Sequence, residues 1–410
     1  MQIALVGTRG VPARYGGFET CVEEVGRRLA TLGHDIVVYC REPGPPNYLG
    51  MRRVEVASIR HRALETLSST ALAVADVVRR RPDVVLVFNS ANAPLLPALR
   101  ARRIPVATHV DGLEWRRAKW TGAGQRYYRR AEAMAVRWSD ALIADAQGIQ
   151  DYYRDEFGVD SEQIAYGAPI LDGVGTDLIG ALGLEPGGFH LVVARFEPEN
   201  HVDLMISGYR LSTAERPLVV VGGVPYGDGY MSRIRAAAGE DARIRLVGPV
   251  WDHALLDQLY ANAYTYLHGH SVGGTNPSLL RAIGAGATTF AYDVVFNREV
   301  LRDAGRFFTT EDDVAALVEG AEADQEDVAR RGQCSRQEAA RYDWDDVAKR
   351  YEHLCEQLAA GRSQKGQASG RRRRRGVAAG SGPDLTAPAL DLPPTSPIQD
   401  RPTAHGSERK

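Results

Sequence analysis

At residues 7–19 the chain reads Gly7-Thr8-Arg9-Gly10-Val11-Pro12-Ala13-Arg14-Tyr15-Gly16-Gly17-Phe18-Glu19. The apolar run 3–6 precedes this stretch, and apolar residues at helical spacing follow it over residues 21–32. The order of strand, glycine-rich loop and helix is typical of a phosphate site, because a helix N-terminus presents free N–H groups and glycines allow close approach. A long turn whose glycines serve only geometry is the alternative, and the length of the loop favours a functional role.

The glycine spacing excludes two common nucleotide sites. Gly7-x-x-Gly10 differs from the G-x-G-x-x-G turn of dinucleotide-binding folds, and the sequence contains no G-x-x-x-x-G-K-[ST] motif. We therefore expect phosphate binding by this loop, with neither a nicotinamide cofactor nor P-loop ATPase chemistry.

The composition is that of a soluble protein with room for two domains. The 410 residues are 44% hydrophobic and 25% charged, and no apolar run is long enough to cross a membrane. The chain enters its first strand at once, without the pattern of a signal peptide, so we expect a cytoplasmic protein. The four cysteines are far apart in sequence, which favours reduced, mostly buried thiols over metal ligands.

The last fifty residues differ chemically from the rest. Residues 361–410 hold ten Lys or Arg and four acids, whereas residues 1–360 hold 40 basic and 48 acidic side chains. Apolar periodicity ends beyond Gly361, so we predict a disordered basic and Pro-rich tail over 361–410. The arginine run 371–375 reads as a solvated charge run, with peripheral contact to anionic lipid at the inner membrane face as the alternative. We expect no nucleic-acid partner.

The remaining sequence alternates short apolar runs with helical stretches, which predicts parallel sheets covered by helices. We expect an N-terminal domain over 1–170, a second domain over 185–340 and a C-terminal helix over 341–360, with a linker at 169–188. The predicted strands are 3–6, 35–40, 54–59, 84–88, 106–110, 141–144 and 164–166, then 190–195, 218–221, 244–247, 265–268, 288–292 and 306–309. Two such domains would enclose a cleft at the carboxyl ends of their strands.

Three further loops carry polar residues at predicted strand ends. Residues 109–120 bring together His109, Asp111, Glu114, basic side chains and two tryptophans, and the alternative is a solvated charged loop. In the second domain, residues 195–201 and 268–278 precede helices. His268 and His270 suggest a metal site, but no third ligand accompanies them, so we prefer a diphosphate or sugar site made of backbone amides and polar side chains.

Several of these motifs resemble a known family. Arg14-Tyr15-Gly16-Gly17-Phe18-Glu19 and Gly33-His34-Asp35 within two linked Rossmann-like domains are similar to the GT-B fold of family 4 retaining glycosyltransferases. Gly7-Thr8-Arg9-Gly10-Val11-Pro12, Asp111-Gly112-Leu113-Glu114-Trp115 and Gly273-Gly274-Thr275-Asn276-Pro277-Ser278 resemble a bacterial rhamnosyltransferase-like subgroup. The resemblance covers about residues 1–358.

The resemblance implies a nucleotide-diphosphate-sugar donor, no metal and no other cofactor. It implies catalytic roles for Arg195, which stabilises the leaving diphosphate, and for His109, which lies near the reacting sugar. The donor-binding residues it implies are Gly16, Gly17, Gly273, Gly274, Thr275, Asn276 and Arg281. The acceptor-side residues it implies are Arg14, Tyr15, Asp111 and Glu114.

Two departures from the family pattern bear on donor binding. Asn200 stands where the family usually has a lysine, and Arg281 stands where it has the glutamate that holds the donor ribose. Because arginine has no hydrogen-bond acceptor, Arg281 predicts weaker donor binding.

The favoured function is transfer of rhamnose or a hexose to a lipid-linked or polysaccharide acceptor in cell-envelope or exopolysaccharide synthesis. A catalytically weak GT-B protein that binds a nucleotide sugar is one alternative, and a sugar-nucleotide epimerase is another.

Overall fold

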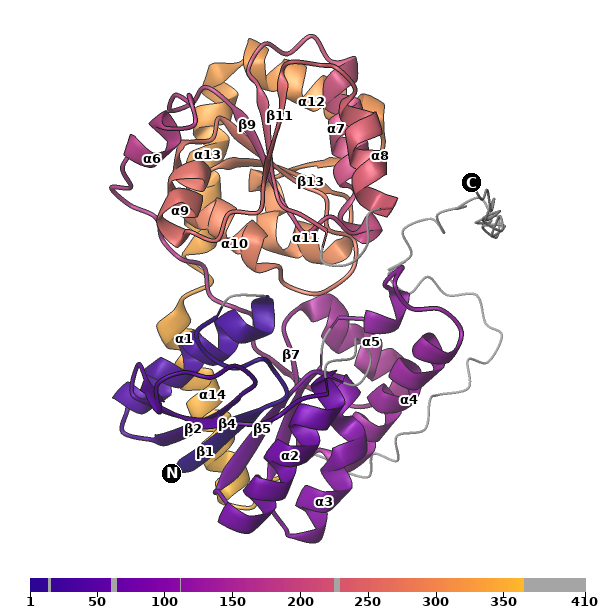
Figure 1. Cartoon of the computed structure of the whole chain (residues 1–410), viewed down its shortest axis with the longest axis vertical. Helices are drawn as coiled ribbons and strands as arrows, with labels where there is room; N and C mark the ends of the chain where they lie inside the picture. The colour runs from indigo at the N-terminus through magenta and orange to yellow at the C-terminus, as the bar shows by residue number, and fades with distance from the viewer. Residues whose placement is uncertain (14–15, 60–64, 111, 225–228, 365–410) are drawn as a thin grey trace, which may run out of the picture.

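The computed structural model describes residues 1–13, 16–59, 65–110, 112–224 and 229–364. They form two α/β domains stacked along the long axis of the molecule, with the N-terminal domain below the second in Figure 1. Each domain has a largely parallel sheet between helices, as the alternating pattern predicts. The arginine run 371–375 and the rest of the tail beyond residue 364 lie outside the described residues.

The N-terminal sheet has the strand order β3-β4-β2-β1-β5-β6-β7-β8 and is parallel except where β3 pairs with β4. Its central strands are buried along their whole length, as expected for strands covered on both faces. Its strands are β1 (Gln2–Val6), β2 (Asp35–Cys40), β3 (Asn47–Tyr48), β4 (Met51–Glu55), β5 (Val84–Phe88), β6 (Val106–Val110), β7 (Ala141–Ala144) and β8 (Glu162–Gln163).

The second sheet is entirely parallel and has the order β11-β10-β9-β12-β13-β14. Its strands are β9 (His190–Val193), β10 (Leu218–Val221), β11 (Ile244–Gly248), β12 (Thr265–His268), β13 (Thr288–Tyr292) and β14 (Arg306–Phe308).

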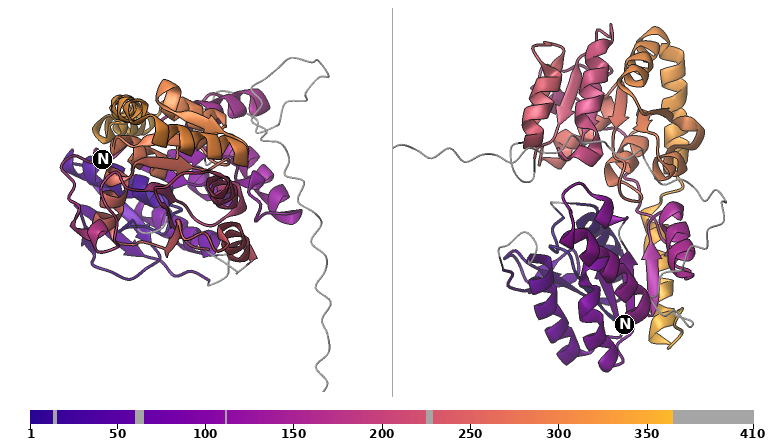
Figure 2. Two further views of the ribbon diagram at one scale, coloured as in Figure 1. Left: turned by 90° about the horizontal axis from the view of Figure 1, so that it is seen from above. Right: turned by 90° about the vertical axis from the view of Figure 1, so that its right-hand side faces the viewer.

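Helices pack on both faces of each sheet (Figure 2). In the first part of the chain they are α1 (Gly17–Thr31), α2 (Glu65–Arg80), α3 (Leu96–Ala101), α4 (Ala123–Trp138) and α5 (Gln147–Phe157), with the short 3-10 turns η1 (Ser90–Leu95) and η2 (Glu114–Arg116). After the linker, which contains α6 (Asp177–Gly180), come α7 (Val202–Leu211), α8 (Gly229–Ala238), α9 (His253–Asn262), α10 (Pro277–Gly284), α11 (Val295–Leu301), α12 (Glu311–Ala323), α13 (Gln325–Ala339) and α14 (Trp344–Ala359), with turns η3 (Pro198–Asn200) and η4 (Arg302–Ala304).

The last helix returns to the N-terminal domain. Asp343 caps α14 by accepting from the amides of Asp345 and Asp346. The buried face of α14 packs against α1, where Tyr351 lies beside Cys21 and Arg28 Nε lies 2.6 Å from Asp345 Oδ1. Residues 341–360 therefore complete the core of the first domain (Figure 2).

One predicted strand has different bounds in the structure, and another is absent. The strand predicted at 54–59 runs instead from Met51 to Glu55, because its pairing with β2 covers Arg52 to Glu55. The strand predicted at 164–166 is absent, since the short pairing with β7 falls on β8. Ile164 and Tyr166 are buried instead as core side chains beneath α14, which gives the segment its apolar character without strand geometry.

No described helix combines the length and the apolarity needed to cross a lipid bilayer. The four cysteines form no disulfide, and Cys21, Cys40 and Cys355 are buried, as predicted from their spacing.

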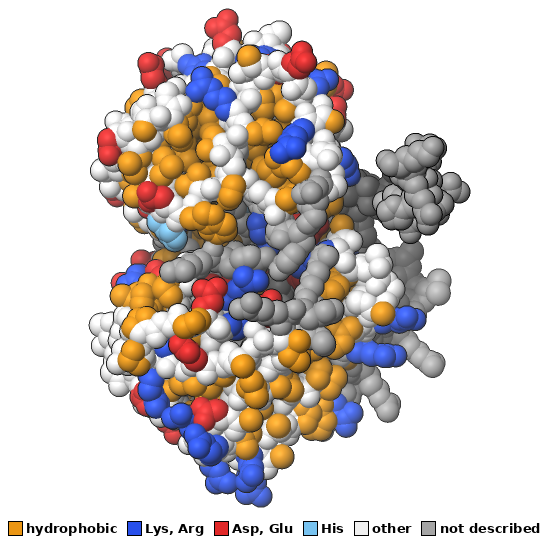
Figure 3. Space-filling model, viewed as in Figure 1, with side chains coloured by type: hydrophobic (Ala, Val, Ile, Leu, Met, Phe, Trp, Pro, Cys, Tyr) orange, Lys and Arg blue, Asp and Glu red, His pale blue; other side chains and the backbone are white. Residues whose placement is uncertain are grey.

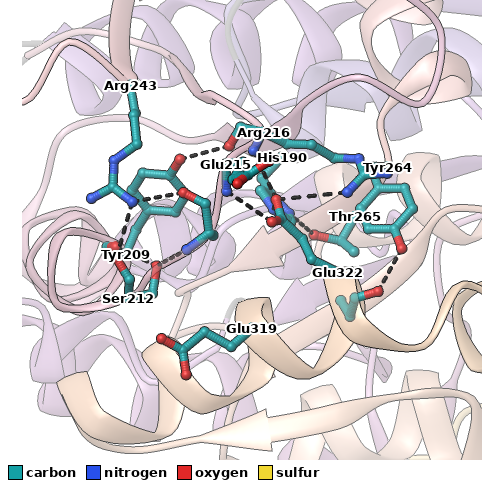
Figure 4. Close-up of polar contacts among 12 residues, drawn as sticks. His190, Tyr209, Ser212, Glu215, Arg216, Arg243, Tyr264, Thr265, Glu319 and Glu322 are labelled. Carbon is teal, nitrogen blue, oxygen red and sulfur yellow. Dashed lines mark hydrogen bonds and ion pairs between the residues drawn. The ribbon is translucent and has the colours of Figure 1, made fainter.

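A carboxylate in the second domain ties α12 to the start of the sheet (Figure 4). Glu322 accepts hydrogen bonds at 2.8 Å from the amides of Glu215 and Arg216, and its Oε1 lies 3.2 Å from His190 Nε2. Burial opposes ionisation, but the hydrogen bonds from His190 and the two amides outweigh it and lower the pKa of Glu322 to about 2. The charged form is therefore the one that stabilises the fold.

We expect Glu322→Gln to lower the free energy of unfolding at pH 7 by ~1–3 kcal/mol. The glutamine side chain has one acceptor oxygen where the carboxylate has two, so a buried hydrogen-bond donor is left without an acceptor. The pKa of Glu322 is depressed in the folded state, so its contribution is present above its ordinary pKa of 4.5 and is lost as the pH falls toward 2. Denaturant unfolding of wild type and variant should therefore converge as the pH falls through that range.

The matched control is Glu319→Gln, one turn earlier on α12, whose carboxylate accepts from exposed Thr213. It should cost well under 1 kcal/mol. Equal losses in the two variants, or a Glu322 effect that persists unchanged at low pH, would contradict this assignment.

Candidate active site

The glycine-rich loop after β1 is shaped by close backbone contacts. Gly7 and Gly10 have φ values of +101° and +93°, and a Cβ at Gly7 would lie 2.3 Å from the Phe88 carbonyl oxygen. Gly16 is the N-cap of α1 and offers no side-chain acceptor, which leaves the first amides of the helix to other partners. Arg14 and Tyr15 lie outside the described residues.

This loop lies at the junction of the two domains, where the carboxyl ends of both sheets meet (Figure 1). A Cβ at Gly17 would lie 3.1 Å from Pro277, the first residue of α10 in the second domain. The N-termini of α1 and α10 therefore converge across the interface, and both bring partial positive charge to it.

Further contacts across the interface depend on glycines. A Cβ at Gly112 would lie 2.2 Å from the Gly273 carbonyl carbon, and one at Gly274 would lie 1.9 Å from Asp145 Oδ1. The hydroxyl of Thr275 donates to the Asp145 carbonyl oxygen. The predicted donor loop 273–276 is thus packed directly on the N-terminal domain, and its backbone comes within contact distance because Gly273 and Gly274 lack side chains.

His109 ends β6 among aromatic side chains. Its ring stacks between Phe88 and Tyr166 and meets the edge of Phe18 at a centroid distance of 5.1 Å. Only 1% of the residue is exposed, and neither ring nitrogen has a hydrogen-bond partner among the described residues. Burial lowers the pKa of His109 to about 3, so the ring is neutral at physiological pH and offers one donor and one acceptor.

The charged loop after β6 is internally paired. Glu114 is 6% exposed and its carboxylate lies within 2.7 Å of Lys119 Nζ, 2.5 Å of Arg117 Nε and 3.2 Å of Trp120 Nε1. Burial favours the neutral acid, but the charges of Arg117 and Lys119 outweigh it and lower the pKa of Glu114 to about 2. Glu114 fixes the shape of this loop, and its predicted role toward an acceptor stays a prediction. Asp111 lies outside the described residues.

Arg195 follows β9 and faces this charged loop. Its side chain is 38% exposed, and its Nη2 lies 3.5 Å from Glu197 Oε2. Asn200 is fully buried and donates from Nδ2 to the Arg195 carbonyl oxygen at 2.8 Å. Asn200 therefore holds the backbone of the loop that carries Arg195. Acidic and basic side chains lie side by side at the junction of the two domains (Figure 3).

His268, the last residue of β12, stacks on His270 with ring centroids 4.4 Å apart. His268 Nδ1 lies 3.2 Å from the Tyr266 hydroxyl. Burial lowers the pKa of His268 to about 3 and places that of His270 well below its ordinary value. In the part of the chain that the structure describes, no group of three or more His, Cys, Asp or Glu side chains is arranged to hold a metal ion.

Asn276 and Arg281 are engaged within the second domain. Asn276 is the N-cap of α10 and accepts from the Ser278 amide at 3.0 Å. Arg281 Nη1 lies 3.0 Å from Asp257 Oδ1 on α9. This ion pair is not predictable from the sequence, because the two residues belong to different helices. The ion pair places the Asp257 carboxylate beside Arg281, the position at which the family that the sequence resembles has glutamate.

Comparisons with known proteins agree with this architecture. Residues 15–166, most of the N-terminal domain, match the family described as Glycosyltransferase Family 4. The GtfA subunit of the UDP-N-acetylglucosamine–peptide N-acetylglucosaminyltransferase of Streptococcus gordonii is 29% identical over 119 residues, which are 28% of this chain. The match spans about a fifth of that curated relative, 22% of its length.

Solved structures show the same two-domain fold over nearly their whole length. Sucrose-phosphate synthase from Thermosynechococcus elongatus superposes with a TM-score of 0.74 at 18% identity, covering 88% of this chain and 99% of that one. HepE from Anabaena, solved in complex with UDP, gives a TM-score of 0.70 at 15% identity and covers 87% of this chain and 100% of its own. The fold is therefore GT-B, as predicted, and the family match and the fold together support a glycosyltransferase.

Proposed function

We propose that this chain is a glycosyltransferase that moves a sugar, rhamnose or a hexose, from a nucleoside-diphosphate donor to a glycan or lipid-linked acceptor in cell-envelope or exopolysaccharide synthesis. The observation that carries the proposal is the meeting of two helix N-termini, at Gly17 and Pro277, at the interface of the two domains. Arg195 lies at the same interface, where it shares the Glu197 carboxylate with Arg117 of the N-terminal domain. Such a place suits a diphosphate, because amide dipoles and a guanidinium stabilise the negative charge that forms there.

In the proposed reaction the bond between the anomeric carbon and the β-phosphate oxygen breaks, and its electron pair goes to the diphosphate. The acceptor oxygen forms the new bond to that carbon, with retention, and its proton passes to the departing phosphate. Arg195 stabilises the charge on the leaving group. His109 is neutral, its ring nitrogens have no hydrogen-bond partner among the described residues, and in this proposal it binds a sugar hydroxyl.

Two names among the comparisons support a nucleotide donor. HepE was solved with UDP and with UDP-glucose, and the Streptococcus protein is named for a UDP-sugar. We extend the class of donor, a nucleoside-diphosphate sugar, to this chain and leave its base and sugar open.

The test is titration of the purified full chain with UDP, GDP and dTDP, followed by incubation with sugar derivatives of the nucleotide that binds. We expect binding together with slow donor hydrolysis, or transfer once an acceptor is supplied. Binding without turnover would favour the weakly active alternative, and isomerisation of the sugar would favour an epimerase.

We further propose that the reaction needs no metal ion. His268, at the end of β12, stacks on His270, and no third ligand accompanies them among the described residues. Treatment with EDTA should therefore leave the rate of donor hydrolysis unchanged. Loss of activity on chelation with recovery on adding Mg²⁺ or Mn²⁺ would reverse this part of the proposal.

A further inference from the structure

The described segment 195–201, which follows β9, offers one arginine to a diphosphate. In the segment 195–201 the cation is Arg195, and the neutral Asn200 is directed to the backbone of its own loop. His268 and His270 add no charge at neutral pH, because burial keeps them unprotonated. A leaving nucleoside diphosphate carries at least two negative charges, so a second cation near Arg195 has a clear electrostatic role.

Such a cation faces Arg195 from the other domain. Arg117 follows η2 in the N-terminal domain, and its side chain is only 11% exposed. Its Nη1 lies 3.5 Å from Glu199 Oε1 and 3.7 Å from Glu197 Oε2, across the interface. Arg195 Nη2 lies 3.5 Å from that same Glu197 oxygen. Two guanidinium groups from opposite domains thus converge on one negatively charged oxygen.

The distances across the interface are those of loose ion pairs. Charge-assisted hydrogen bonds between nitrogen and a carboxylate oxygen are ~2.7–2.9 Å long. Glu197 Oε2 and Glu199 Oε1 are both buried, and neither has a hydrogen-bond partner among the described residues. At these two oxygens the contacts with the arginines are electrostatic and longer than hydrogen bonds, and a phosphate group can compete with them.

Glu114, on the same loop of the N-terminal domain, fixes the orientation of Arg117. Its Nε pairs with Glu114, which is itself held by Lys119 and Trp120. This contact directs Nη1 of Arg117 toward Glu197 and Glu199 of the second domain. His270 lies close enough to both Arg117 and Arg195 for their charges to oppose its protonation, which places all three at one site.

We propose that Arg117 is the second diphosphate-binding cation of this protein, supplied by the N-terminal domain in place of a cation at Asn200. Arg117 and Arg195 would grip the leaving diphosphate from opposite sides, and Glu197 and Glu199 would hold the two arginines until the donor arrives. The inference rests on the proposed function, since it assigns a residue to the same donor site. It also makes the site complete only when the two domains are together.

The test compares Arg117→Gln with Arg116→Gln in the full chain, using UDP, GDP and dTDP as probes in calorimetry and the matching monophosphates as references. Arg117→Gln should weaken diphosphate binding by roughly 10–100-fold, the usual effect of losing a hydrogen bond to a charged group. Monophosphate binding should weaken less than threefold. Arg116, the neighbouring arginine, contacts the Trp115 ring, and its variant should bind like wild type.

Glu199→Gln separates diphosphate binding from a merely structural role. If Arg117 only holds the domains together, removing its partner Glu199 should weaken binding as much as removing Arg117. If Arg117 binds phosphate, Glu199→Gln releases it from a competing carboxylate, and binding should be unchanged or tighter. Melting temperatures of all three variants check that each one folds.

Equal diphosphate affinity in wild type and Arg117→Gln would overturn this inference while leaving the proposed function intact. So would parallel losses in Arg117→Gln and Glu199→Gln. Failure of the folded wild type to bind any of the three diphosphates would instead count against the proposed function.

Discussion

Arg195→Ala is expected to lower turnover by ~10²-fold or more while the protein stays folded. Loss of one group that stabilises charge on a leaving group typically costs ~10²–10³-fold in rate. Arg195 follows the first strand of the second sheet and shares a carboxylate oxygen with Arg117, so it lies where that charge is proposed to develop. Its side chain is partly exposed, and the fold should therefore tolerate its removal.

The measurement is donor hydrolysis at saturating donor, with melting temperature as the check on folding. Arg233→Ala is the matched control, because Arg233 is an exposed arginine of the same domain that also pairs with one carboxylate, Asp203. It should keep wild-type turnover. Unchanged turnover in folded Arg195→Ala would remove Arg195 from the mechanism.

Gly112→Ala should reduce turnover by a factor on the order of 10². The substitution removes no functional group but displaces the two domains relative to each other. The added methyl group would lie 2.2 Å from backbone of Gly273, so the N-terminal domain and the donor loop must move apart. A displacement of about 1 Å between reacting groups is enough for a loss of this size. The nucleotide should still bind through Arg195 and the N-terminus of α10, which keep their places within the second domain, but more weakly than in wild type because Arg117 moves away with the N-terminal domain.

Gly320→Ala provides the control for the methyl group itself. Gly320 lies within α12, and nothing lies within 4 Å of the place where its Cβ would be. Alanine there should leave turnover unchanged and slightly favour the helix. If Gly112→Ala kept wild-type turnover, the close approach of the two loops would not matter for catalysis.

The sequence predicts most of the fold because strand patterns are local. The strands at 35–40, 84–88, 106–110, 141–144, 218–221, 265–268 and 288–292 appear with the predicted bounds. Short buried runs between helical stretches leave few other arrangements. The segment at 164–166 misled because burial beneath α14 produces the same apolar pattern as a strand.

The pairing of charges across the interface was not predictable from the sequence. Arg117 stood out only as one of several charged residues in a loop, and its contacts to Glu197 and Glu199 depend on how the domains meet. Arg281 is similar: the sequence predicted weaker donor binding from its lack of an acceptor, and its partner Asp257 comes from another helix. That prediction remains untested, and Arg281→Glu would now place two carboxylates side by side.

The central claim is that a nucleoside diphosphate lies between the N-termini of α1 and α10 and engages both domains. Amide hydrogen exchange of the full chain, with and without the nucleotide diphosphate that binds, tests this most directly. The account predicts slower exchange at residues 16–20 of the first domain and at residues 273–280 of the second. Protection confined to one domain, or protection that leaves both helix N-termini unchanged, would contradict it.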